Sequence, residues 1–358
     1  MAYTTIDDPS QYFHIQLYTG NGTAIGSGGN AITNNANSGN FKPDWTWHKV
    51  RSTANDHQIY DSSRGVKIRL NTNATNSDFT LNEGLQSFDT NGFTVGSDNG
   101  VNQNSQTFVA WQWKANGGTT STNSDGSKNT IVQANTTAGF SIVTYSGPSG
   151  SGVDTRGHGL GAVPAVVLIK GRGGTENWVM YHHKNTSAPE TDVLKLNLTN
   201  ATADESGNFN DTAPTSTVFT SGDTGATNED GNTYVAYCFA EKQGYSKFGS
   251  YTGNGNNDGP FVYTGFKPAW VLYKRTNDAG NWRILDNKRN TFNVMNNEIY
   301  ADLNNAEAQD NQMDFLSNGF KLRNGSSVGQ NGNGSTYIYM AFAEHPFVSS
   351  EGVPVTAR

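Results

Sequence analysis

The stretch FKPDWTWHKVR at residues 41–51 decides the fold, because the chain repeats it. It returns as FKPAWVLYKR at 266–275 and, in a more divergent form, as AVPAVVLIKGR at 162–172. An opening motif precedes each copy: YTGNG at 18–22, YSG at 145–147 and YTGNG at 251–255. A strand-like segment closes each copy: TFVAWQWKA from 107, TYVAYCFAE from 233 and TYIYMAFAE from 336. This recurring order indicates a tandem triplication of a unit of about 100 residues, which is the size of a domain.

Short apolar segments alternate with turns rich in Gly, Asn, Asp and Ser, and no long segment has the 3.6-residue period of a helix. The NGF sequences at 91–93 and 318–320 are typical of hairpin turns. We therefore predict an all-β protein with three tandem antiparallel β-sandwich domains, jelly-roll-like or lectin-like in topology. A helix is expected only at 301–309.

The motifs also set the predicted boundaries. These are an N-terminal arm at 1–10, sandwich domains at 11–116, 139–242 and 243–346, a linker or irregular strand at 117–138, and a C-terminal tail at 347–358. The three sandwich segments are named repeats 1, 2 and 3 below.

Composition excludes several classes of function. The formal charge is −7 with only 15% charged residues, and no basic cluster is present, so a nucleic-acid groove is not expected. Cys238 is the single cysteine, which rules out an intrachain disulfide framework, and no Cys/His spacing suggests zinc. The N-terminus lacks the pattern of a secretory signal, and no apolar run reaches the roughly 20 residues that span a bilayer. We expect a protein made in a cytoplasm, without membrane insertion.

Aligning the repeats tests which aromatic residues belong to the core. Four positions stay apolar in every repeat: Trp45/Val166/Trp270, Trp47/Leu168/Leu272, Trp111/Tyr237/Met340 and Trp113/Phe239/Phe342. Members of each repeat lie two apart on one strand face, so they are predicted to be buried.

One aromatic position behaves differently. Trp178 and Trp282 correspond to a polar His57 in repeat 1, so this position is expected to be partly exposed. These three residues are the ligand-binding candidates, because exposed rings stack on sugar faces. The alternative, an amphipathic ring at a domain edge, stays open.

No catalytic motif is present, and the histidines and carboxylates are scattered among turns. Asp61 with Arg64 recurs as Asp286 with Arg289, yet repeat 2 has His182 and Asn185 at these places. A catalytic pair would not be lost from one repeat, so a surface ion pair is predicted. We expect no catalytic residue, no metal and no cofactor.

Taken together, YTGNG, FKPDWTWHKVR, GFSIVTYSG at 139–147, GHGLGAVPA at 157–165 and TFVAWQWKANGGTT from 107 resemble a repeat domain of structural proteins in marine tailed phages, of cyanophage and pelagiphage type. The opening MAYTTIDDPSQYF is similar to such proteins as well. The resemblance implies a non-enzymatic virion component, made in the host cytoplasm, that decorates a capsid or forms part of a head, neck or tail fibre.

Its implied partners are other virion proteins of the capsid, portal, neck or tail, with a homo-oligomer such as a trimer also considered. An alternative function is a lectin-like adhesin that binds host-surface glycans. A weaker alternative is a polysaccharide depolymerase, which needs a cleft with paired carboxylates.

The N-terminal arm is too short and too polar to pack alone. Tyr3, Ile6, Asp7 and Pro9 are therefore predicted to order it by docking on another virion protein or a sister subunit, with a free tail as the alternative.

Overall fold

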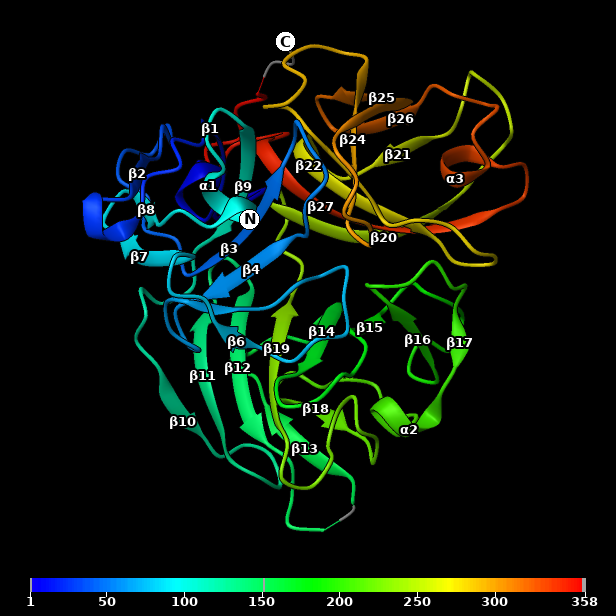
Figure 1. The fold of residues 1–358 in the computed structure, drawn as a ribbon. Coiled ribbons are helices and arrows are strands. Elements are labelled where there is room, and N and C mark those ends of the chain that lie inside the picture. Colours follow the sequence, from blue (N-terminus) through cyan, green and yellow to red (C-terminus); the bar gives the residue numbers. More distant parts are fainter. Residues whose placement is uncertain (1, 151, 356–358) are drawn as a thin grey trace.

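A computed structural model describes residues 2–150 and 152–355 of the chain. The described chain is almost entirely antiparallel β structure, as predicted. Figure 1 shows three lobes around a common centre: repeat 1 in blue to cyan, repeat 2 in green and repeat 3 in yellow to red.

Repeat 1 is built on an inner sheet with the strand order β1-β9-β3-β4. These strands are Phe13–Thr19, Thr107–Trp113, Trp45–Val50 and Gln58–Asp61. A second sheet, β2-β8-β7, covers its outer face with Asn30–Thr33, Gly92–Val95 and Leu85–Asp89. The connections contain the short pair β5 (Ile68–Arg69) and β6 (Phe79–Thr80), the single turn α1 (Asn99–Asn102), and 3-10 turns at Pro9–Gln11 and Ile25–Ser27.

Repeat 2 has the equivalent inner order β12-β19-β14-β15, formed by Phe140–Ser146, Thr233–Phe239, Val166–Gly171 and Val179–His182. The sheet continues through β11 (Thr130–Asn135) and β10 (Ser121–Asn123) at one edge, and β16 (Asp192–Lys195) and β17 (Ala203–Asp204) at the other. A separate pair joins β13 (Asp154–Gly157) to β18 (Val218–Ser221), and α2 spans Ser206–Phe209. The segment predicted as a linker or irregular strand, 117–138, thus supplies two strands to this sheet.

Repeat 3 has the inner order β20-β27-β22-β23, formed by Ser246–Thr252, Thr336–Pro346, Phe266–Arg275 and Arg283–Asp286. The sheet continues through β24 (Met295–Tyr300), β25 (Ala308–Leu316), β26 (Gly319–Leu322) and β21 (Phe261–Tyr263). The turn α3 covers Val328–Asn331.

The tyrosine of the opening motif makes the same two contacts in each repeat. Tyr18 stacks on Phe108 of the closing strand, with ring centroids 4.9 Å apart, and its hydroxyl donates to a backbone carbonyl. Tyr145 on Tyr234 and Tyr251 on Tyr337 repeat both contacts. The glycine two residues later lies so close to backbone that an added Cβ would meet a carbonyl oxygen at 2.4 Å or less in every repeat. Only glycine fits there.

The inner sheets are buried on both faces. One face of each contributes to a single common core, in which residues of all three repeats are in contact. Trp45 packs on Tyr237 at 4.6 Å, Trp113 on Phe342 at 5.6 Å, and Phe239 on Phe342 at 6.0 Å between ring centroids. The other faces cover three separate outer cores, one in each repeat. The prediction that the four apolar positions are buried is confirmed for every residue named above.

The predicted helix at 301–309 is wrong. β24 ends at Tyr300 and β25 begins at Ala308, with a turn between them. The backbone N–H of Ala301 donates to the Trp282 carbonyl, and the Asp302 carboxylate accepts from the Trp282 N–H, so this segment continues a strand pairing. Helices in the described chain are limited to short turns. The predicted domain boundaries, and the jelly-roll topology, stay predictions.

Candidate functional site

The three ligand-binding candidates are fully buried, so the exposure predicted for them is wrong. Each side chain lies at an interface between repeats and donates a ring N–H to a backbone carbonyl of a neighbouring repeat. These bonds are Trp178 Nε1 to Asn71 O at 2.7 Å, Trp282 Nε1 to Lys195 O at 2.9 Å and His57 Nε2 to Tyr300 O at 2.8 Å. They run in a cycle, from repeat 2 to 1, from 3 to 2 and from 1 to 3. His replaces Trp here because both can donate one N–H, not because the position meets solvent.

The N-terminal arm is ordered by its own chain. Tyr3 donates to the Gly265 carbonyl at 2.7 Å, and Ile6 is buried in the common core. The Asp7 carboxylate accepts from the backbone N–H of Ser350 at 2.6 Å and from its hydroxyl, and Pro9 is buried. The arm therefore contacts residues of its own chain, and its docking on another protein or a sister subunit stays a prediction. Residue 1 and residues 356–358 lie outside the described residues.

The interface between repeats 1 and 3 contains a partly buried ionic clamp. Glu307 lies between Arg51, at 2.9 Å, and Arg289, at 3.0 Å. Arg289 also contacts Asp286 at 2.6 Å, and both side chains of this pair are completely buried. The Trp111 indole donates to the same carboxylate at 3.0 Å.

The interface between repeats 1 and 2 has the same clamp. Asp78 lies between Arg172, at 2.6 Å, and Arg64, at 3.7 Å, and Arg64 contacts Asp61 at 2.5 Å. The prediction of surface ion pairs is therefore wrong. Asp61–Arg64 and Asp286–Arg289 are buried because a neighbouring repeat packs over them. The sequence of a single repeat does not reveal this contact between repeats.

The interface between repeats 2 and 3 lacks the clamp. Backbone hydrogen bonds identify the equivalent positions in the three interfaces. The N–H groups of Arg51, Arg172 and Thr276 donate to the carbonyls of Thr107, Thr233 and Thr336, respectively. The carbonyls of the same three residues accept from the N–H groups of Glu307, Asp78 and Thr202, respectively. Thr276 thus replaces the first arginine and Thr202 replaces the central carboxylate, while Asn185 replaces the second arginine. The Thr202 hydroxyl donates to Asn185 Oδ1 at 2.7 Å. All three charged groups of the clamp have become neutral polar groups.

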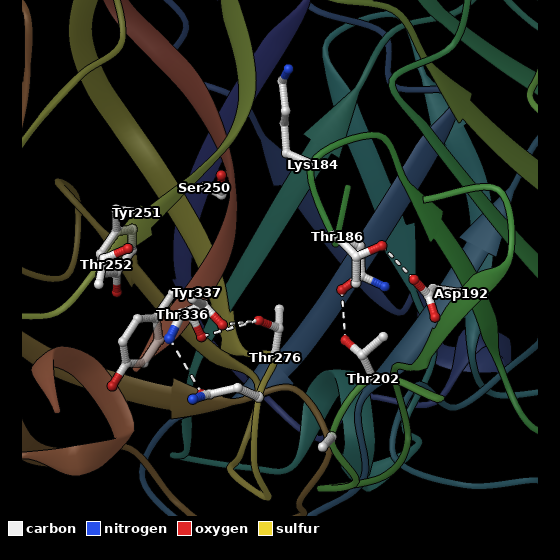
Figure 2. A pocket seen from close by; sticks show the side chains of 13 residues that line it. Lys184, Thr186, Asp192, Thr202, Ser250, Tyr251, Thr252, Thr276, Thr336 and Tyr337 are labelled. Atoms are coloured by element: carbon white, nitrogen blue, oxygen red, sulfur yellow. Dashed lines mark hydrogen bonds between the residues drawn. The ribbon is translucent and has the colours of Figure 1, made fainter. Parts of the chain in front are cut away.

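A cleft of about 710 Å³, with both polar and apolar lining, opens at this interface (Figure 2). Its lining comes from both repeats: Lys184, Asn185, Thr186, Asp192, Ala201, Thr202, Ser250, Tyr251, Thr252, Thr276, Asn277, Thr336 and Tyr337. Figure 2 shows Thr186 and Thr202 of repeat 2 across from Thr276 and Thr336 of repeat 3. The Thr276 and Thr336 hydroxyls are 2.7 Å apart, and the Thr186 hydroxyl donates to Asp192. Hydroxyl and amide groups therefore supply much of the polar surface that a ligand would meet, beside an apolar part of similar extent.

The charges at the cleft are few and balanced. Lys184 and Asp192 are its charged lining residues, one of each sign. His182, which stands where the other repeats have Asp61 and Asp286, is fully buried, and burial lowers its pKa to about 3. Its imidazole is neutral at physiological pH, so it does not restore the charge of the aspartate that it replaces.

A sequence comparison places the whole repeat array in one family. The profile of a domain of unknown function, DUF7483, matches residues 8–346. The chain belongs to the DUF7483 family. No match was found among the curated proteins or among the solved structures. The DUF7483 match spans all three repeats, and therefore the common core and each of the interfaces between them.

Within residues 2–150 and 152–355, no group of three or more His, Cys, Asp or Glu side chains is arranged to hold a metal ion. No helix of the described chain is long and apolar enough to cross a membrane.

Each interface of this DUF7483 chain also contains a buried lysine. Lys49 Nζ donates to Asn304 O at 3.3 Å, Lys170 Nζ to Thr75 O at 3.0 Å and Lys274 Nζ to Thr199 O at 3.1 Å. Each also donates to the carbonyl of the residue that follows it. Burial lowers the pKa of all three to about 8. These lysines link each repeat to a neighbour, so they are structural residues.

The sequence contains a signal for the cleft, divided between two repeats. Repeat 2 has lost both charged residues of the Asp-x-x-Arg motif, and repeat 3 has Lys-Arg-Thr at 274–276 where the others have Lys-x-Arg. The two losses lie far apart in the chain. They become one feature only when repeats 2 and 3 are known to share an interface.

Proposed function

We propose that this chain is a non-enzymatic structural protein of a phage particle, located in the virion as capsid decoration or as part of a head, neck or tail fibre. The common core carries the proposal: the three repeats close on one another and bury their tryptophans. The outside of such a body is polar, with only 15% charged residues in the chain. A self-contained body of this kind suits a protein that must persist on a particle. The motifs shared with marine phage structural proteins support the same assignment.

We further propose that each repeat is a β-sandwich domain of lectin-like or jelly-roll-like topology. In repeat 1, two sheets enclose an outer core that includes Tyr60, Leu85, Phe93 and Val101. Repeats 2 and 3 enclose their outer cores with the extended sheets described above. In this proposal the chain imitates a trimer, with the inner sheets as its interfaces.

A second candidate function is the binding of host-surface glycans, which the hydroxyl-lined cleft favours. The cleft does not favour a polysaccharide depolymerase. Glycoside hydrolysis uses two carboxyl groups about 5–9.5 Å apart, and Asp192 is the one carboxylate among the lining residues. Incubation with host polysaccharides is expected to release no reducing ends.

The particle itself provides the test. Purified phage particles would be analysed by quantitative mass spectrometry for this chain, and its position would be determined by electron cryomicroscopy. Tens to hundreds of copies on the shell indicate decoration, whereas a handful at one vertex indicates a neck or tail fibre. A chain that is abundant in infected cells but absent from purified particles contradicts the proposal.

A further inference from the structure

We infer that the cleft between repeats 2 and 3 is a binding site for a short neutral saccharide, positioned by Asn185, Thr202 and Thr276. The inference rests on the second candidate function above, glycan binding, and goes beyond it by naming the site and the class of ligand.

The three interfaces between repeats differ in charge. Two of them contain a carboxylate held between two arginines, and the third has replaced all three members by neutral groups. The carboxylate and the two arginines are paired with one another, so the three replacements together remove a complete cluster of charges. Two guanidinium groups are thereby removed from this interface, and the space is open as the cleft.

The cleft is lined by several hydroxyl groups. Threonine and serine hydroxyls each donate one hydrogen bond and accept others, as sugar hydroxyls do, so the two surfaces are complementary. The groups are held in place before a ligand arrives, because Thr202 is bonded to Asn185 and Thr276 is bonded to Thr336. Asn185 is only 7% exposed, and its Nδ2 has no hydrogen-bond partner in the described part of the chain. This Nδ2 atom is itself covered, so a ligand oxygen would supply the missing acceptor only if the Asn185 amide turned toward the cleft.

The charge and the size of the cleft suit a short neutral ligand. Lys184 and Asp192 balance each other, and the neighbouring His182 is neutral, so the cleft does not select a charged ligand. A volume of about 710 Å³ lies within the usual range for small-ligand sites, about 300–1,000 Å³. A disaccharide or trisaccharide fits this space. The open side of the cleft lets a longer glycan extend into solvent.

Calorimetric titration of the full chain with neutral di- and trisaccharides of glucose, galactose, mannose and N-acetylglucosamine tests the site. The variant Ser250→Trp places a bulky ring on an exposed position of the cleft and is expected to weaken binding at least tenfold. Thr144→Trp is the matched control, because Thr144 occupies the same position on β12 as Ser250 on β20, and it is expected to bind as the parent does.

A rebuilt clamp gives an independent variant. Asn185→Arg combined with Thr202→Glu is expected to abolish binding, and circular dichroism would show whether it folds. Should it not fold, Ser250→Trp still decides the question.

Three results would overturn the inference. Equal affinity of the parent and Ser250→Trp moves the site elsewhere, although glycan binding as a function survives. Absence of binding to every saccharide removes both the site and the second candidate function, while the structural role in the particle is untouched. Tighter binding of uronate or sulfated trisaccharides than of neutral ones contradicts the neutral class of ligand.

Discussion

Replacement of Arg289 by Met tests the clamp between repeats 1 and 3. The parent guanidinium is fully buried and contacts Asp286 at 2.6 Å and Glu307 at 3.0 Å. It also donates to the carbonyls of Asn297 and Ile284. Methionine keeps most of the side-chain volume but removes the charge and every donor. The Asp286 carboxylate retains the Trp111 indole and two backbone N–H donors, so it stays partly satisfied.

The expected loss of stability depends on the Asp286 carboxylate, whose charge remains in the variant. Removing one partner of a buried ion pair typically costs about 3–5 kcal/mol, because the other charge is left in a medium that solvates it poorly. Glu307 keeps Arg51, so its carboxylate does not add a second unpaired charge. We therefore expect Arg289→Met to lower the free energy of unfolding by about 3–5 kcal/mol.

The chain provides its own control at the equivalent position of repeat 2. Asn185→Met removes one neutral hydrogen bond, to Thr202, and is expected to cost about 1 kcal/mol. Urea unfolding followed by tryptophan fluorescence measures both variants against the parent. Equal losses in the two variants, or a loss below about 1 kcal/mol for Arg289→Met, would refute the clamp as a source of stability.

Three further predictions concern stability. Trp113→Ala empties an aromatic core site and is expected to cost about 3–5 kcal/mol in urea unfolding; a loss below about 1 kcal/mol would place the ring outside the core. Ile6→Ala, in the arm, is expected to cost about 2–5 kcal/mol, and an unchanged melting temperature would show that the arm is not docked. Lys49, Lys170 and Lys274 release protons at about pH 8 when folded but near 10.5 when unfolded, so stability is expected to rise between pH 8 and 10. Urea midpoints at pH 7, 8, 9 and 10 measure this rise, which replacement of all three by Met should remove.

Much of the fold was predictable from the sequence, because equivalent positions can be compared across the three repeats. A position that keeps its apolar character in three copies, such as Trp113/Phe239/Phe342, belongs to a core whatever the topology. The turns and the alternating segments then gave the all-β class.

The relation between repeats was not predictable in the same way. His57 looked exposed because it is polar, and Arg64 looked superficial because repeat 2 lacks it. Both are buried by a neighbouring repeat that lies far away in the sequence. The alternation of apolar and polar residues indicates which face of a strand is buried within its own repeat. It does not show whether another repeat covers the polar end of a side chain. For the same reason, the cleft could be recognised only after Asn185 and Thr276 had been brought to one interface.

Hydrogen–deuterium exchange of the full chain, with and without a saturating neutral trisaccharide, tests most directly whether the interface without a clamp is the functional one. The three interfaces act as internal references within one molecule. We predict slower exchange on binding in segments 184–192, 250–252 and 276–277, which line the cleft, and no change around Arg64 and Arg289. Protection that is equal at all three interfaces, or that lies outside the cleft, would contradict the account.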